Sequence, residues 1–213
     1  MKHAAVIILI SLFACNAAPD PVSKDAPARR VAITTVNCDY QASKTSCKKI
    51  FAAYKQQPTA VSKERLIKFI CDSLMPCWYG TPWDFNGTST QPGTGSIACG
   101  YFVTTVLQDA GVTINRSKMA QCASSILVEK TCTAIERYSN KTIEHFVNGV
   151  KLKGKGLYIT GLDAHTGFIY NDGREVYFIH SSIYPPRTVV KEKALESAAL
   201  RYTKFRMIGM IRF

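Results

Sequence analysis

Cys99 is the residue of this chain best placed to act as a nucleophile. It stands in Gly95-Ser96-Ile97-Ala98-Cys99-Gly100, where a loop rich in glycine, serine, threonine and proline meets an apolar segment. Apolar residues then recur at helical spacing up to Ala110, and Gly111 ends the pattern, which predicts a helix over residues 99–110. The unpaired N–H groups of a first helical turn favour an anion such as a thiolate. The competing interpretation is a small buried hydrophobe or one half of a disulfide.

A reactive thiol at this position needs help from another group. A free cysteine titrates near about 8.5, so a mainly ionised thiol at neutral pH requires a shift of roughly two units, or about 3 kcal/mol. A helix terminus typically supplies about 0.3–1 kcal/mol. We therefore expect a cationic partner beside Cys99.

Two of the four histidines flank a predicted hairpin. His165 opens one strand, His180 closes the next, and the turn Asn171-Asp172-Gly173 lies between them. In an antiparallel pair the far ends of the two strands meet, so both imidazoles should lie near one edge of the sheet. His3 falls in the leader, and His145 is most simply a surface or partly buried helix residue.

Each histidine alone could satisfy a local hydrogen bond at a strand end. Two at the ends of one hairpin, together with Cys99, predict a Cys-His-His relay. His165 would accept the thiol proton and become the required cation, and His180 would bond the other ring nitrogen and orient the ring. Asp163 is a weaker candidate for this orienting role.

The N-terminus has the features of an export signal. A charged start and a short apolar run predict a signal peptide over residues 1–14, and Leu12-Phe13-Ala14-Cys15 resembles a bacterial lipobox. The resemblance implies acylation of Cys15, a flexible linker over 15–31 and one domain over 32–213. We expect a monomer, lipid-anchored in the bacterial cell envelope and facing the periplasm or outer membrane. Ordinary cleavage near Ala17, giving a secreted protein, is the alternative.

The remaining cysteines suggest disulfides. Of eight cysteines, Cys15 goes to lipid or is removed and Cys99 is the candidate nucleophile, which leaves an even number for an oxidising compartment. Pairing of sequence neighbours would close short loops worth about 2–3 kcal/mol each. The pairs are Cys38 with Cys47, Cys71 with Cys77, and Cys122 with Cys132. Cys99 would then be the unpaired thiol. The chain has no C-x-x-C pair and no histidine at ligand spacing nearby, so we expect no metal and no cofactor.

The rest of the chain reads as helices followed by strands. Expected helices cover 47–54, 62–74 with Ser62 as N-cap, 117–128, 133–138, 142–147 and 193–200. Expected strands cover 31–36, 157–160, 165–170, 175–180, 187–190 and 205–213. This order predicts an α+β fold with an antiparallel sheet.

The chain is basic, with 27 Lys and Arg against 15 Asp and Glu and a net charge of +12. Such a surface can bind nucleic acid. The basic residues are dispersed, however, and export argues against a nucleic-acid partner. Attraction to an anionic envelope polymer fits better.

Several motifs together resemble the NlpC-type papain-like cysteine peptidases of bacterial cell walls, over residues 78–180. In order, they are Gly80-Thr81-Pro82-Trp83, the glycine-rich loop with Cys99, Asp109-Ala110-Gly111, His165-x-Gly167-Phe168-Ile169 and Phe178-Ile179-His180-Ser181. The resemblance implies a papain-like core, in which the cysteine helix packs on an antiparallel sheet, with an extra N-terminal helical part. It also implies a hydrolase acting on peptidoglycan stem peptides, with Cys99 as nucleophile, His165 as base and later acid, and His180 as the polar third member.

The chain departs from the family at three positions. Ala98 and Gly100 stand where the family usually has Asp and Ser, and Trp83 stands where a Tyr is thought to help bind the oxyanion. By the resemblance, Trp83 is the oxyanion or substrate residue, and an indole N–H can donate there. The departures bear on substrate choice more than on the nucleophile.

The expected reaction is acyl transfer through a thioester at Cys99. One alternative is a lipid-anchored binding or scaffold module that has the fold but no turnover. Another is an amidase or transpeptidase acting on a different exported substrate, such as a protein glutamine or an acylated lipid.

Overall fold

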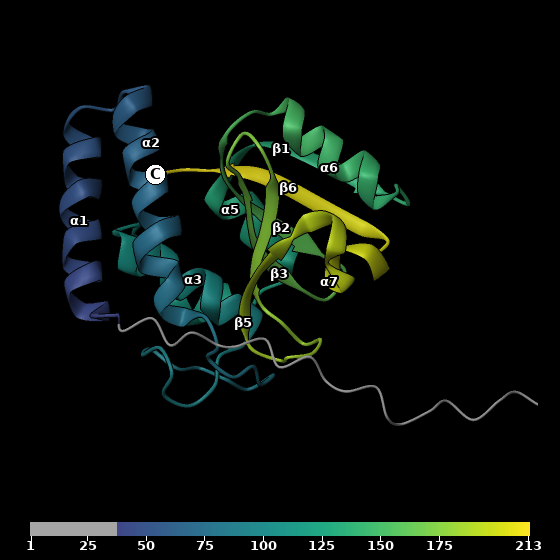
Figure 1. Ribbon diagram of the computed structural model, residues 1–213, viewed down its shortest axis with the longest axis horizontal. Helices are drawn as coiled ribbons and strands as arrows, with labels where there is room; N and C mark the ends of the chain where they lie inside the picture. The colour runs from purple at the N-terminus through teal and green to yellow at the C-terminus, as the bar shows by residue number, and fades with distance from the viewer. Residues whose placement is uncertain (1–37) are drawn as a thin grey trace, which may run out of the picture. The chain divides into compact units, whose positions relative to one another are not determined.

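A six-stranded antiparallel sheet lies at the centre of the molecule, with the strand order β1-β6-β2-β3-β4-β5 (Figure 1). The computed structural model describes residues 38–213. The strands are β1 (Cys132–Ser139), β2 (Gly156–Leu162), β3 (Thr166–Asn171), β4 (Val176–Ser181), β5 (Val189–Lys193) and β6 (Phe205–Ile211). The predicted signal peptide, Cys15, the linker and the strand over 31–36 lie outside the described residues.

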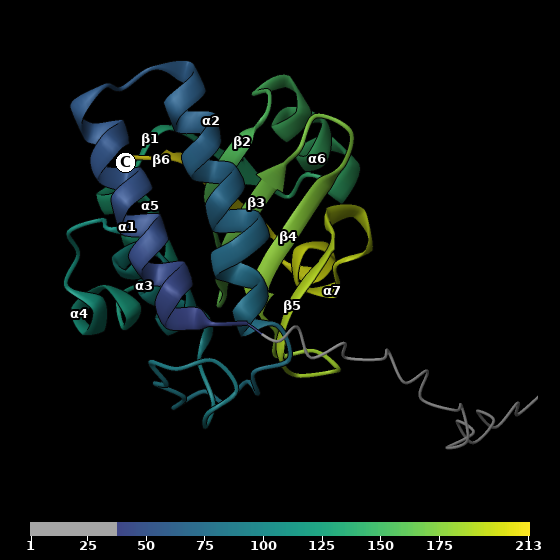
Figure 2. The same cartoon turned by 60° about the vertical axis from the view of Figure 1, so that its left-hand side comes forward.

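Helices cover both faces of this sheet (Figure 1; Figure 2). The α-helices are α1 (Tyr40–Gln56), α2 (Ala60–Phe69), α3 (Cys99–Ala110), α4 (Arg116–Ala120), α5 (Ser124–Thr131), α6 (Ile143–Leu152) and α7 (Ala198–Tyr202). The short helices η1 (Ile70–Leu74) and η2 (Met75–Trp78) continue α2, and η3 (Ala194–Glu196) precedes α7. Within residues 38–213, no helix is both long enough and apolar enough to cross a membrane.

Side chains alternate between the two faces of the sheet along each strand, which explains why helices pack on both faces. In β2, Leu157 and Ile159 join the core formed with α1, α2, α3 and α5, whereas Tyr158 joins the core formed with α6 and α7. Adjacent residues of a strand point to opposite faces, so strands with few polar residues must be covered on both sides. The predicted α+β class with an antiparallel sheet is confirmed.

The elements around the predicted site match the sequence analysis closely. The helix that starts at Cys99 ends at Ala110, and Gly111 follows in the left-handed conformation at φ 110°. Strands β2, β3, β4 and β6 lie where they were expected. The N-cap assigned to Ser62 is wrong, because Thr59 caps α2 and Ser62 is the reciprocal partner of its capping box.

Two segments differ most from the prediction, and the helix expected over 193–200 is also divided among the end of β5, η3 and α7. Residues 117–128 form two helices, α4 and α5, separated at 121–123, and residues 133–138 belong to strand β1 rather than to a helix. The second difference has a tertiary cause, since β1 pairs with β6 and completes the sheet at that edge. Gly209 of β6 leaves the room that the Cys132 side chain occupies. Backbone pairing has overridden a weak helical pattern.

The disulfide pairing predicted between sequence neighbours is wrong. Cys38 is joined to Cys77 in η2, with 5.4 Å between their Cα atoms. The hairpin of α1 and α2 runs antiparallel, so the residue before α1 meets the end of the second helical arm (Figure 2). Cys47 and Cys71 are instead buried free thiols.

A helical stretch separates the members of each predicted pair. A helix rises about 1.5 Å per residue, and a disulfide needs Cα atoms within about 7 Å. Cys122 and Cys132, for example, stand at opposite ends of α5. Five cysteines are free within residues 38–213, so Cys99 is not distinguished by being the one unpaired thiol. The assignment of Cys99 as a nucleophile therefore depends on the residues around it.

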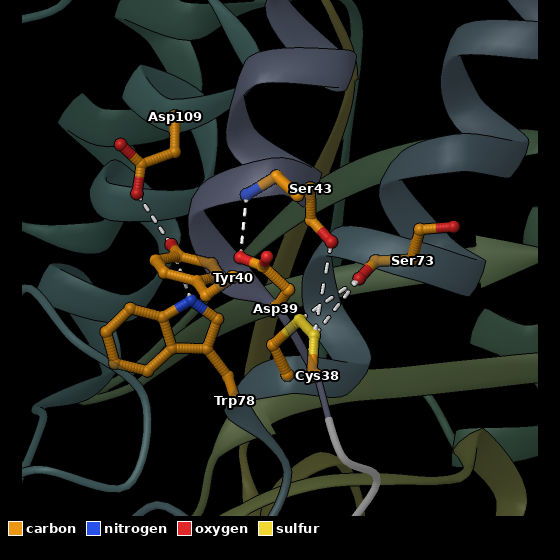
Figure 3. The surroundings of a disulfide bond; sticks show 9 residues. Cys38, Asp39, Tyr40, Ser43, Ser73, Trp78 and Asp109 are labelled. Carbon is orange, nitrogen blue, oxygen red and sulfur yellow. Dashed lines mark hydrogen bonds between the residues drawn. A yellow bond between two sulfur atoms is a disulfide. The ribbon is translucent and has the colours of Figure 1, made fainter.

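A buried polar network ties the N-terminal hairpin to α3 (Figure 3). The Trp78 indole donates to the Tyr40 hydroxyl at 2.8 Å, and that hydroxyl donates to Asp109 at 2.6 Å. Lys44 lies 3.2 Å from the other Asp109 oxygen. The carboxylate is therefore paired, and the helix that carries Cys99 is anchored at its far end.

Replacing both bridged cysteines in the double variant Cys38→Ser/Cys77→Ser should lower the free energy of unfolding by about 3–4 kcal/mol. The bridge closes a loop across 39 residues, which restricts the unfolded chain. Urea denaturation under non-reducing conditions measures the loss. Peptide mapping of the parent chain provides the control, and a Cys38–Cys47 or Cys71–Cys77 linkage there would contradict the structure.

Candidate functional site

Hydrogen bonds attach the segment before Cys99 to strands β4 and β5. The amide of Gly80 donates to the Val189 carbonyl at 2.9 Å, and the Ser181 hydroxyl donates to the Ile97 carbonyl at 2.6 Å. Ala98 occupies the N-cap of α3 and provides no side-chain cap. Cys99 is therefore held at the start of α3, with its side chain partly exposed.

Gly100 is required by close packing at the start of α3. A Cβ on this residue would collide with the carbonyl of Ala120, the last residue of α4. The backbone of α4 thus packs directly against the first turn of α3.

The two imidazoles meet as the hairpin geometry predicted. His165 Nε2 lies 2.7 Å from His180 Nδ1. The His180 side chain is fully buried and stacks on Phe178, with 4.0 Å between ring centroids and 16° between ring planes. His165 meets the same phenyl ring edge-on at 6.0 Å. The prediction that the two histidines lie together is confirmed.

Gly167, between the histidines, makes this packing possible. A Cβ added there would lie 2.6 Å from the Phe178 ring and 2.7 Å from His180 Cβ. Both distances are shorter than carbon atoms tolerate, so any side chain at 167 would displace the imidazole of His180 or its supporting ring.

Sequence reasoning missed a third member of this chain of side chains, Glu192 of β5. Its Oε1 lies 3.0 Å from His180 Nε2. The register of β4 and β5 sets Glu192 opposite Phe178, the ring that supports His180. The predicted strand ended at Val190 and the predicted helix began at Lys193, so Glu192 fell between them. Extending the strand by two residues would have placed it beside the hairpin.

Asp163 has a different role from the one considered for it. Its Oδ2 accepts from the Thr203 hydroxyl and the Lys204 amide, both at 2.7 Å, and from the Phe205 amide at 3.3 Å. These bonds fix the start of β6 and lower the pKa of the carboxyl. The His165 ring is bonded by His180, as predicted, and not by Asp163, and His180 is in turn bonded by Glu192.

The protonation states of the site follow from burial. Burial lowers the pKa of His165 well below its usual value, and the neighbouring His180 lowers it further. Burial also lowers the pKa of His180, although Glu192 acts in the opposite direction. Both rings are therefore neutral at neutral pH.

The thiol is shifted toward its neutral form as well. Burial raises the pKa of Cys99, and the backbone N–H groups of Thr166, Gly100 and Cys99 itself offset part of that rise. The cationic partner expected from the sequence is therefore not present in the resting site. The Cys99 thiol and the His165 imidazole are therefore both neutral at rest.

Cys99 and His165 line one cavity of about 460 Å³. Its wall is mainly apolar and includes Phe85, Leu127 and Phe205. The cavity is closed on one side by the segment between α4 and α5, which carries Cys122. The Cys99 and His165 side chains thus border the same cavity.

The other predicted residues lie elsewhere. Trp83 does not line this cavity, and the Arg187 guanidinium lies over its ring, with 4.9 Å from Cζ to the centroid. The structure does not bring Trp83 and Cys99 together. His145 is exposed on α6 beside Tyr138, which agrees with the prediction that it is a surface residue. Among residues 38–213, no three His, Cys, Asp or Glu side chains are grouped to hold a metal ion.

Comparisons with known proteins give no relative. No family model matches the chain, and neither a curated protein nor a solved structure is similar to it. The function is therefore inferred from the geometry and chemistry of the site.

Replacing Gly167 with Ala should destabilise the fold by about 1–3 kcal/mol and displace His180, because the added methyl group overlaps Phe178 and His180. Thermal unfolding and the imidazole NMR signals measure the two effects. Gly156→Ala in β2 is the matched control, since a Cβ there comes no closer than 3.2 Å to its nearest neighbour, the Tyr158 hydroxyl. Equal behaviour of the two variants would contradict the packing described.

Alkylation of Cys99 by iodoacetamide should be slower at neutral pH than that of a free cysteine and should rise with pH beyond about 8.5. A raised thiol pKa leaves less thiolate at neutral pH, which gives the sign of the effect. Mass spectrometry of the Cys99 peptide measures the rate, with Cys122→Ser as the background that removes the neighbouring thiol. A rate already maximal near about pH 6 would indicate a thiolate–imidazolium pair instead.

Proposed function

We propose that the protein is a cysteine hydrolase that cleaves amide bonds through an acyl-enzyme at Cys99. The observation that carries this proposal is one cavity lined by the thiol of Cys99 and the ring of His165, with His180 and Glu192 in line behind that ring. A nucleophile, a base and an oriented support for the base are the parts that acyl transfer requires.

The architecture supports the papain-like interpretation, which we include in the proposal. Helix α3 carries the cysteine at its first residue and packs against β3 and β4, the strands of the histidine hairpin. The same arrangement is implied by the resemblance to NlpC-type peptidases. The hairpin of α1 and α2 and the segment from α4 to α6 are then additions around this core.

The reaction would proceed in two halves. His165 takes the thiol proton as Cys99 Sγ bonds to the carbonyl carbon, and the backbone N–H of Cys99 stabilises the oxyanion. The C–N bond then breaks, and His165 returns the proton to the leaving amine. A water molecule next attacks the thioester and gives a proton to His165, which protonates the departing sulfur as the carboxylic acid forms.

Peptidoglycan stem peptides are the substrate class that we propose. The net charge of +12 favours an anionic polymer of the cell envelope. Export and a lipid anchor at Cys15 belong to the same proposal. The Cys38–Cys77 bridge supports an oxidising compartment.

A second candidate is a binding or scaffold module with the same fold and no turnover. The raised pKa of Cys99 favours it, because a protonated thiol reacts slowly unless a base is correctly placed. An amidase or transpeptidase acting on another exported substrate would use the same residues and differs only in the acyl donor and acceptor.

Purified peptidoglycan fragments should be cleaved by the protein, with new amino and carboxyl termini detected by mass spectrometry. Cys99→Ala should abolish cleavage, and His165→Ala should reduce its rate by about 10²–10⁴-fold, the usual contribution of a general base. His145→Ala is the matched control, since this exposed histidine should be dispensable. Full folding and substrate binding without any cleavage would favour the binding module.

A further inference from the structure

The side chains behind Cys99 form a chain of hydrogen bonds with a chemically distinct end. Two contacts connect three groups: Glu192 Oε1 to His180 Nε2 at 3.0 Å, and His180 Nδ1 to His165 Nε2 at 2.7 Å. An ionised carboxylate can only accept, whereas each neutral imidazole has one N–H and one bare nitrogen. The carboxylate therefore determines which ring nitrogen of each imidazole carries the proton.

We propose that Glu192 is a positioning residue that fixes the tautomers of both imidazoles and so leaves Nδ1 of His165 as the bare nitrogen of the site. His180 must place its proton on Nε2 to donate to Glu192, which leaves its Nδ1 as an acceptor. His165 must then donate from Nε2, and its Nδ1 has no proton. The side chain that lines the cavity with Cys99 is thus set as a base.

Two other proton arrangements would reverse this outcome. A doubly protonated His180, or a protonated Glu192, would let the chain run the other way and place a proton on Nδ1 of His165. Burial holds the pKa of His180 below its usual value. Burial raises the pKa of Glu192, but hydrogen bonds from His180 and Ser197 bring it below the usual value overall. At neutral pH, then, Glu192 is ionised and His180 is neutral.

The charged neighbours do not compete for Glu192. On its own strand, Lys191 lies over the Tyr177 ring at 4.2 Å, and Lys193 lies 3.8 Å from Glu196. Among residues 38–213, Glu192 bonds the neutral ring of His180 and forms no ion pair with a lysine or arginine. From the helical side, Ser197 supplies a neutral hydroxyl. The carboxylate is therefore directed at His180.

This inference deepens the proposed function, because a bare Nδ1 matters for catalysis only if His165 serves as a base. It also holds as a statement about the resting protein. A tautomer can be measured without substrate, so the two proposals can fail separately.

Nitrogen-15 NMR of the histidine-labelled full chain at neutral pH tests the inference directly. Variants at His3 and His145 identify the signals of these two histidines. The remaining signals then belong to His165 and His180. Both buried rings should show a protonated Nε2 and a bare Nδ1. A proton on Nδ1 of either ring would overturn the proposal.

The variant Glu192→Gln retains the shape but presents both a donor and an acceptor, so both directions of the chain become available. A population with protonated Nδ1 should appear in both rings, and alkylation of Cys99 should slow in proportion to that population, by about twofold where the two directions are equally populated. Glu196→Gln, the same change at an exposed neighbour, should alter neither. Unchanged tautomers in a folded Glu192→Gln chain would contradict the proposal, and if that variant does not fold, the spectrum of the parent chain still decides.

Discussion

Antiparallel pairing of β3 with β4 is the constraint on which the site depends. The register that sets Phe168 opposite Ile179 brings the start of one strand and the end of the other together. A slip of one residue would turn His180 to the opposite face of the sheet and separate it from His165 and Glu192. The separate register of β4 with β5 sets Glu192 opposite Phe178, so two sets of backbone hydrogen bonds position His165, just before β3, His180 of β4 and Glu192 of β5.

The helical layer supports the site through a continuous line of aromatic contacts. Tyr40 meets Trp78 edge-on at 5.5 Å, Trp78 meets Phe102 of α3 at 6.3 Å, and Phe102 meets Phe168 of β3 at 5.9 Å. These contacts connect the N-terminal hairpin to the cysteine helix and then to the histidine hairpin. Close-packed aromatic side chains leave little room for movement, so the relative position of α3 and β3 is well defined.

Local signals in the sequence were sufficient for the parts of the site that depend on short-range structure. The helix at Cys99 and the hairpin carrying His165 and His180 follow from spacing, glycines and a turn motif. The parts that depend on distant contacts were missed or wrong. The partner of Cys38 depends on how two helices pair, β1 depends on a free edge of β6, and Glu192 depends on the strand that lies beside β4 in space.

The Cys38–Cys77 bridge has a mechanical consequence for any load applied through the N-terminal residues. A pull on the chain ahead of Cys38 reaches a covalent bond at the first described residue and passes to Cys77, so that residues 39–76 carry none of it. From Cys77 the force reaches Trp78, whose fully buried ring lies against α3 and Tyr40. The hairpin of α1 and α2 is thus a loop closed by the disulfide, and tension acts on the molecule at a fully buried residue.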